Sequence, residues 1–248
     1  SGDRQGKNSF EGYLNLLGNN SKWTTETSTG ENILPISTSS FHEGVSISGS
    51  SNHFRMMSSP EAGTVYDDIL EPLWIQGMTG GDVTSGDANV WTYSTSGQSW
   101  SALSNLSTAS LTAGAGFLVY VYADTDNDGD DDLAVTLSVN GTANNSSATV
   151  GSIADGNWAL IGNPYYSTID WDNVSKTDLA TSAYVYDNAK SGGAGYIAWN
   201  GSSGSLSNGL IAAYQGFWVQ ASGGTGSITI DVGDKSGTAG TFYKTMND

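Results

Sequence analysis

Short runs of alternating hydrophobic and polar residues recur along the chain. Leu133–Val139 and Ser227–Val232 follow a period of two, which places their apolar side chains on one face, as in a half-buried β-strand. Phe117–Tyr122 is apolar or aromatic at every position, which indicates a strand that is covered on both faces or lies between the two copies. Ser191–Gly195 and Gly201–Gly209 are rich in Gly and Ser and predict hairpin loops. The pattern therefore predicts a chain built mainly of short β-strands.

Helical signals are few. One short helix is predicted at Asp67–Leu73 or at Asp172–Leu179, with an aspartate as its N-cap. Pro60 and Pro164 each follow a strand-like run, and proline ends a hydrogen-bonded ladder, so both mark a corner between a strand and a loop.

An internal repeat orders the predicted strands. Phe54–Asp68 aligns without a gap with Trp158–Asp172, and proline, threonine and aspartate recur at matching positions. Three further blocks follow in the same order in both copies: Val90–Tyr93 with Ala183–Tyr186, Gly114–Val119 with Tyr214–Val219, and Val135–Val139 with Ile228–Val232. The matching order predicts an internal duplication.

We therefore predict an all-β fold made of two similar β-sandwich or jelly-roll-like units, or one composite sandwich with pseudo-twofold symmetry. The first β repeat spans residues 44–141 and carries an acidic loop, and the second spans residues 142–234. Residues 1–43 are expected to form an N-terminal β segment, in which Tyr13–Gly18 resembles the repeat-closing Thr136–Gly141, as at the end of an upstream repeat. Residues 235–248 are expected to form a tail or linker.

Composition supports a folded, soluble chain. Hydrophobic residues make up 37% and charged residues 13%, and the eight tryptophans and twelve tyrosines are atypical of disordered proteins. No apolar run is long enough to span a bilayer, so membrane insertion is not expected. Cysteine is absent, which excludes disulfides, thiol chemistry and Cys-ligated zinc, and two histidines offer little for a His-rich metal site.

The formal charge of −17 argues against anionic partners. No Lys or Arg occurs between Arg55 and Lys176, whereas fifteen Asp or Glu do. Nucleic acid is not an expected ligand, because phosphate binding needs basic side chains, and anionic membrane surfaces are disfavoured by the same repulsion. Ser1–Arg4 does not begin a signal peptide, so we interpret the chain as a mature or excised fragment. The Ser-, Thr- and Asn-rich, Lys-poor composition favours a secreted microbial protein.

An aspartate-rich loop distinguishes the first repeat. In Asp124–Asp132, aspartate recurs at loop positions 1, 3, 5, 7 and 9 with glycine at position 6, which is the ligand spacing of calcium loops. Position 12 is Val135, where a bidentate glutamate normally completes the shell. A weak structural calcium site and a solvated acidic turn are both compatible with this pattern. The candidate calcium ligands are Asp124, Asp126, Asp128, Asp130 and Asp132.

The aromatic residues suggest a second chemistry. Exposed Trp and Tyr rings can pack on the C–H face of a pyranose while nearby polar groups bind its hydroxyls. Phe54, Trp158, Phe117 and Phe217 occupy aligned strand positions, so we expect them in the core, and Trp218 is ambiguous. The candidate ligand-binding rings lie in loops or where the two copies differ: they are Trp74, Trp100, Tyr165, Tyr166 and Trp199.

Catalysis is not predicted. Asp67, Asp68, Asp170 and Asp172 could supply the paired carboxylates of a glycoside hydrolase. However, Asp68 and Asp172 occupy equivalent places after a proline corner, which fits a repeated turn or capping role better. No nucleophile elbow, His-Glu-x-x-His motif or phosphate loop is present.

Four motifs resemble a known class of surface proteins. Phe54–Pro60, Leu73–Gly77, Trp158–Pro164 and Gln215–Val219 resemble segments of large secreted surface proteins of Bacteroidota, in which such modules lie upstream of a type IX secretion sorting domain. The resemblance covers residues 44–244. It implies export across the outer membrane and an extracellular or cell-surface location, and it implies no catalytic residues.

Together these features predict a non-catalytic extracellular module that contacts a polysaccharide or cell-surface glycan, for adhesion or polysaccharide capture. The alternative is a structural spacer or a self-assembling filament or surface-layer subunit, in which exposed strand edges of one module pair with the next.

Overall fold

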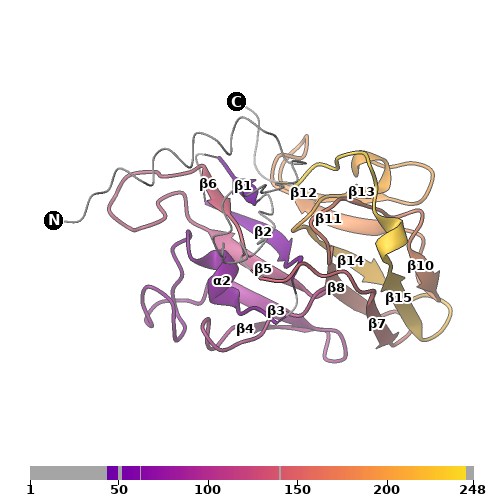
Figure 1. The fold of residues 1–248 in the computed structure, drawn as a ribbon, viewed down its shortest axis with the longest axis horizontal. Coiled ribbons are helices and arrows are strands. Elements are labelled where there is room, and N and C mark those ends of the chain that lie inside the picture. The colour runs from indigo at the N-terminus through magenta and orange to yellow at the C-terminus, as the bar shows by residue number, and fades with distance from the viewer. Residues whose placement is uncertain (1–43, 50–51, 62, 140, 244–248) are drawn as a thin grey trace, which may run out of the picture. The chain divides into compact units, whose positions relative to one another are not determined.

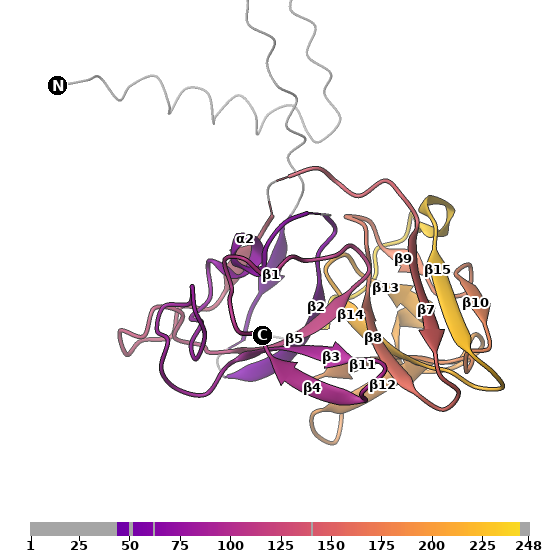
Figure 2. The same cartoon turned by 90° about the horizontal axis from the view of Figure 1, so that it is seen from below.

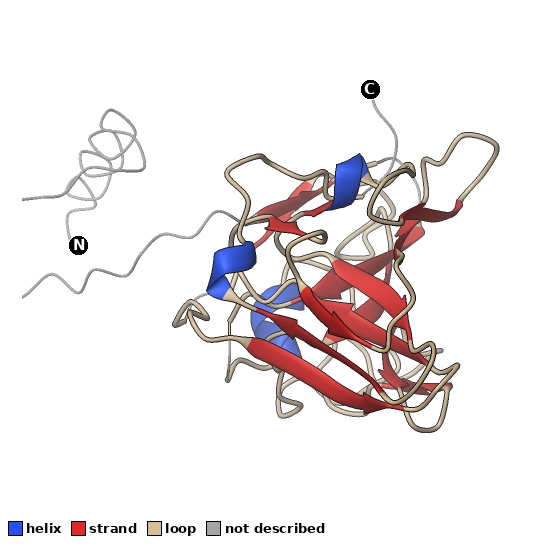
Figure 3. Ribbon diagram, turned by 90° about the vertical axis from the view of Figure 1, so that its right-hand side faces the viewer, coloured by secondary structure: helices blue, strands red, loops and turns tan. Residues whose placement is uncertain are grey.

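Antiparallel strands form nearly all the regular structure, and the few helical segments are short (Figure 3). The computed structural model describes residues 44–49, 52–61, 63–139 and 141–243, which belong to one compact unit, residues 41–248. The all-β prediction is confirmed. The expected N-terminal segment 1–43 lies outside the described residues.

The first half of this unit packs two antiparallel sheets around one core. A four-stranded sheet has the order β2-β5-β3-β4, and β1 pairs with β6 (Figure 1). The strands are β1 (Val45–Ile47), β2 (His53–Ser58), β3 (Val90–Ser94), β4 (Ser99–Ala102), β5 (Gly116–Val121) and β6 (Val135–Leu137). Alternate residues of β5, among them Phe117 and Val119, point into the core, where Tyr66 of helix α2 (Tyr66–Leu70) meets Phe117 edge to face at 5.1 Å. The other face of β5 is only half-buried, so the expected cover on both faces is wrong.

The second half repeats this arrangement. Its four-stranded sheet has the order β8-β14-β11-β12, and its inner face packs against a three-stranded sheet, β10-β15-β7. A short β9-β13 pair completes it. The strands are β7 (Ala148–Ile153), β8 (Trp158–Gly162), β9 (Ile169–Asp170), β10 (Ser175–Thr177), β11 (Ala183–Asp187), β12 (Gly195–Trp199), β13 (Leu210–Ile211), β14 (Gly216–Gln220) and β15 (Gly226–Ile230). Two single 3₁₀ turns are η1 (Ser207–Gly209) and η2 (Val232–Asp234).

Equivalent strands occupy equivalent places in the two four-stranded sheets. If β2, β5, β3 and β4 are matched with β8, β14, β11 and β12, the two strand orders are the same. Contacts between the halves repeat in the same way: Ser58 N donates to Tyr214 O at 2.9 Å, and Gly162 N donates to Gly114 O at 2.9 Å. This is the arrangement that a duplication would produce, and the duplication itself stays a prediction.

Two local expectations need correction. A helix forms at Tyr66–Leu70, but the predicted aspartate N-cap is wrong: the N-cap is Val65, and Asp68 in the first turn accepts the Val65 N–H at 2.7 Å. Asp172–Leu179 contains strand β10 instead of a helix. Residues 235–243 are not a free linker, because Lys235 bridges to Ile169 and Thr241 to Ile211. The second half therefore extends past the predicted boundary at residue 234.

Candidate functional site

The outer faces of the two four-stranded sheets meet in a small apolar cluster. Met56 of β2, Leu160 of β8 and Trp218 of β14 are its buried members. The pleat of β3 and β4 places Tyr93 and Trp100 opposite each other on the same outer face. In Figure 2, β3 runs up to β8, with which it is in contact, and this junction joins the two halves.

These residues form an aromatic groove of about 430 Å³, which lies within the usual size range of small-molecule sites. Its lining residues are Tyr93, Trp100, Trp158, Tyr184, Tyr196 and Trp218. None of them carries a charge at neutral pH, so the groove offers ring surface, phenol hydroxyls and indole N–H groups.

Trp218 is the deepest of the six rings. It is only 8% exposed and stands nearly perpendicular to three neighbours, with interplanar angles of 88° to Tyr93, 83° to Trp100 and 89° to Trp158. The corresponding centroid distances are 4.6, 5.6 and 6.4 Å. Trp100 and Tyr196 remain 40% and 51% exposed. Because the rings are not coplanar, a ligand would enter a walled groove and would not lie on a flat platform.

A hydrogen-bonded hairpin joins the two sides of the groove. In the turn between β3 and β4, Gln98 Nε2 donates to Trp158 O at 2.8 Å, and Trp158 N donates to Gln98 Oε1 at 2.9 Å. Asn157 Nδ2 adds a bond to Thr95 O at 3.2 Å. We refer to the paired Gln98–Trp158 bonds as the Gln98 clamp. The clamp fixes the strand that carries Trp100 relative to the strand that begins with Trp158.

The groove tyrosines are neutral at physiological pH. Burial raises the pKa of Tyr93. Burial, and to a lesser extent the proximity of Tyr186, also raises the pKa of Tyr196, and this exceeds the opposing effect of a hydrogen bond with Trp218. Both hydroxyls therefore stay protonated and can donate as well as accept a hydrogen bond.

Comparison with known proteins identifies no relative. No family model matches the chain, and no curated protein or solved structure is significantly similar to it. Within the described residues, no helix is long and apolar enough to cross a membrane.

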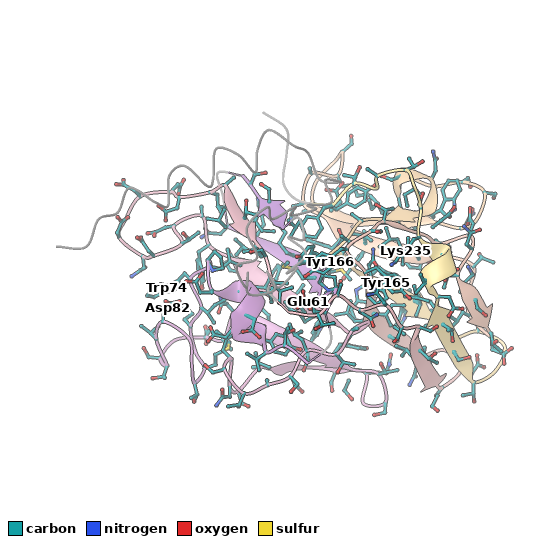
Figure 4. All side chains as sticks on the ribbon, viewed as in Figure 1. Glu61, Trp74, Asp82, Tyr165, Tyr166 and Lys235 are labelled. Carbon is teal, nitrogen blue, oxygen red and sulfur yellow. The ribbon has the colours of Figure 1, made fainter. Side chains whose placement is uncertain are left out.

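Of the five rings predicted to bind ligand, only Trp100 lines the groove. Trp74 lies in a loop of the first half, where its Nε1 donates to Gln76 Oε1 at 3.1 Å, and Figure 4 shows it well apart from Tyr165 and Tyr166. Trp199 packs against the second core, and its Nε1 donates to Asp172 Oδ1 at 3.0 Å.

The two adjacent tyrosines have structural contacts. Tyr165 is fully buried, donates to both Ser146 O and Ile230 O, and has Lys235 Nζ 4.5 Å above its ring. No external ligand can reach this ring, so its predicted role is wrong. Tyr166 is half-buried, and its hydroxyl donates to Glu61 Oε1 and to Val139 O, which ties the second half to the first (Figure 4).

The expected core aromatics divide into two pairs. Phe117 and Phe217 are fully buried, as predicted. Phe54 is 36% exposed and Trp158 lines the groove, so the core prediction is wrong for both. The reason is register: Phe54 pairs with Tyr120 and Trp158 with Gln220, and these pairs point to the outer faces of the sheets.

The acidic loop brings three of its five candidate ligands together. One carboxylate oxygen from each of Asp124, Asp126 and Asp128 lies within 4.8 Å of the other two. Asp130 and Asp132 lie outside this group, and Asp132 Oδ2 instead accepts the Thr125 N–H at 2.7 Å. Partial desolvation, followed by the neighbouring Asp128 and Asp132 carboxylates, raises the pKa of Asp126. Three converging carboxylates could hold one divalent cation.

The paired aspartates considered for catalysis have local structural contacts. Asp68 accepts the Val65 N–H, Asp67 Oδ2 accepts the Ser107 hydroxyl at 3.3 Å, and Asp170 Oδ1 accepts the Asp172 N–H at 3.0 Å. None of these carboxylates lines the aromatic groove.

Proposed function

We propose that the chain is a non-catalytic extracellular module that captures a neutral polysaccharide in its aromatic groove. The observation that carries this proposal is the convergence of six Trp and Tyr rings from both halves on one solvent-accessible groove. Burying the apolar C–H faces of a sugar against such rings releases water from both surfaces. The neutral phenols of Tyr93 and Tyr196 supply hydrogen bonds for sugar hydroxyls.

Charge favours a neutral glycan over an acidic one. The chain carries a formal charge of −17, and no basic side chain lines the groove. Arg55, which lies on β2, is 1% exposed and turned into the core. A uronic acid chain would enter an environment of negative potential without a cation to pair with it.

The resemblance to secreted Bacteroidota proteins supports an extracellular location for this module. We propose that it lies outside the cell, at the surface or released, after export by type IX secretion. Adhesion and polysaccharide capture both require such a location. The calcium expected at Asp124, Asp126 and Asp128 would stabilise the loop, away from the groove.

Affinity electrophoresis in native gels tests the proposal. Each gel contains a single polysaccharide. The neutral ones are cellulose derivatives, xylan, mannan and starch, and the acidic ones are alginate and pectate. We expect at least one neutral polymer to retard the protein, and Trp100→Ala to remove that retardation. Val232→Ala is the matched control, because Val232 is 43% exposed and lies in η2, outside the groove. Retardation by no polymer, or equally in wild type and Trp100→Ala, would overturn the proposal.

One observation favours the structural alternative. Strand β4 lies at the edge of its sheet, every residue in Ser99–Ala102 is exposed, and the strand contains neither proline nor charge to block pairing. A second molecule could add a strand there. Concentration-dependent polymers in light scattering, together with no polysaccharide binding, would favour this function.

A further inference from the structure

A second group of rings, of which Phe54 is exposed and the others are half-buried, lies at the position equivalent to part of the groove. Matching the strands of the two halves places Phe54 and Trp91 where the second half has Trp158 and Tyr184. Both pairs are in ring contact, with centroids 5.9 Å apart for Phe54–Trp91 and 5.3 Å for Trp158–Tyr184. The groove-lining pair therefore has a counterpart on the outer face of the first sheet.

The two outer strands of each sheet also carry matching ring pairs. Tyr93 and Trp100 meet at 5.2 Å on β3 and β4, and Tyr186 and Tyr196 meet at 5.4 Å on the equivalent β11 and β12. Tyr196 also lines the groove. It thus belongs both to the groove and to the counterpart of the Tyr93–Trp100 pair.

The hairpin contacts between the halves are also paired. Asn188, in the turn after β11, donates from Nδ2 to Phe54 O at 2.7 Å, much as Gln98 Nε2 donates to Trp158 O. The hairpin that carries Tyr196 is therefore bonded to the strand that carries Phe54. This contact connects the groove to the rings of the first sheet.

The rings of the first sheet continue beyond this contact. Tyr120 meets Phe54 at 4.9 Å, and Tyr122 meets Tyr120 at 5.2 Å, both edge to face. We refer to Phe54, Trp91, Tyr120 and Tyr122 as the Phe54 cluster. Four large hydrophobic side chains are exposed in the described part of the chain, and three of them (Phe54, Trp100 and Tyr196) belong to the groove or this cluster.

One residue difference between the two halves makes the cluster shallower than the groove. Trp218, the deepest ring of the groove, is replaced at the equivalent position of β5 by Leu118. The cluster therefore offers an open ring surface and no deep hollow. Such a surface suits the continuation of a chain already held elsewhere better than a separate small ligand.

We propose that the Phe54 cluster is a second subsite for the same polysaccharide chain, so that the protein binds an internal stretch of polymer that passes from the groove over Tyr196 to Phe54. This inference rests on the proposed function. The ligand class is a neutral, linear polysaccharide, because both subsites present rings without a basic side chain among them, and the Asp87 carboxylate beside Tyr122 would repel an acidic chain. Short oligosaccharides fill the groove alone, and longer ones reach the cluster and bind more tightly.

Isothermal titration with oligosaccharides of increasing length tests the second subsite. The probes are cello-, xylo- and manno-oligosaccharides from the disaccharide to the hexasaccharide. For the series that binds, we expect the affinity of the wild-type protein to rise with length. Phe54→Ala should weaken hexasaccharide binding by roughly 5- to 30-fold, the loss of one stacked ring, and leave disaccharide binding unchanged.

Two further variants make the outcomes separable. Trp100→Ala should weaken binding at every length, and Val232→Ala should change none. Urea unfolding of each variant checks that its fold is intact. If Phe54→Ala binds the hexasaccharide like wild type while Trp100→Ala loses it, the second subsite is wrong and the proposed function stands. If no series binds to the wild-type protein, the proposed function itself fails.

Discussion

Replacing Gln98 by glutamate tests whether the Gln98 clamp positions the groove. The change keeps the shape of the side chain but turns its donor Nε2 into an acceptor. In the wild-type protein, Nε2 donates to Trp158 O at 2.8 Å and to Thr95 O at 2.6 Å. The introduced carboxylate would face both carbonyl oxygens, and only the bond from Trp158 N to Oε1 would remain.

The magnitude follows from these contacts. Each lost hydrogen bond contributes about 1 kcal/mol to stability, and carbonyls left facing an acceptor add a further penalty. We expect Gln98→Glu to lower the free energy of unfolding at pH 7 by about 2–3 kcal/mol. The carbonyls raise the pKa of the introduced carboxyl above its usual value of about 4.3, because they disfavour its charged form. Part of the stability should therefore return as the pH falls through this raised pKa.

Urea unfolding and polysaccharide binding are measured on the same samples. Gln76→Glu is the matched control: Gln76 Nε2 donates to Asp87 O at 3.0 Å, entirely within the first half. Both variants should lose stability, but only Gln98→Glu should also lose affinity, since Gln98 bonds to Trp158 across the groove and Gln76 makes no contact with the groove residues. Equal affinities in the two variants would refute a positioning role for the clamp.

Three further predictions follow. Gly162→Ala should destabilise the protein by about 3 kcal/mol or more in urea unfolding, because its Cβ would lie 2.1 Å from the Ser58 Cβ, whereas Gly233→Ala, which meets nothing within 4 Å, should be nearly neutral. Calcium should raise the temperature midpoint of thermal unfolding of the wild-type protein, and Asp126→Asn should reduce that shift. Asp131→Asn, an equal charge change in the same loop, should leave the shift unchanged. No calcium-dependent shift in the wild-type protein would contradict the site. Burial raises the pKa of Tyr66 to about 12, so its contribution to stability is complete below pH ~10, the unfolded value, and is lost as the pH rises through about 12. Tyr66→Phe should flatten this alkaline loss by about 2 kcal/mol, and an unchanged pH profile would show that Tyr66 titrates normally.

The fold class was accessible from sequence because it depends on local patterns. The alternation in Ser227–Val232 corresponds to β15, which places Ile228 and Ile230 in the core. The short helix near Asp67 was also predictable, although not its cap: Val65 is the N-cap, and Asp68 at the third helical position accepts its N–H. The helix predicted at Asp172–Leu179 failed because the pairing of β10 with β15 overrides local helix signals there.

The groove was less accessible because it depends on register between distant strands. Trp158 aligns with Phe54 and Phe217 aligns with Phe117, yet Trp158 lines the groove and Phe217 is buried in the core. A shift of one residue along a strand reverses the face to which a side chain points. The alternation of Tyr184 and Tyr186 with buried Val185 held the missing signal, since it indicates aromatic residues on the face opposite the core.

The groove exists because the two halves cross closely at glycine. A Cβ on Gly116 would lie 2.6 Å from Ile161 O, and one on Gly216 would lie 2.8 Å from Met57 O, so these backbones meet without intervening side chains. Met57 bridges to Gln215, and Ile161 bridges to Ala115, the residue at the equivalent position. These crossings bring together the outer faces of two sheets that would otherwise be exposed to solvent.

The ring surface is therefore a property of the joined pair. Tyr93 and Trp100 come from the first half, and Trp158, Tyr184, Tyr196 and Trp218 come from the second. Either half alone would present a one-sided array of exposed rings without the perpendicular walls that enclose a ligand. The first core itself includes Tyr214 of the second half, so both the groove and this core depend on the packing of the two halves against each other.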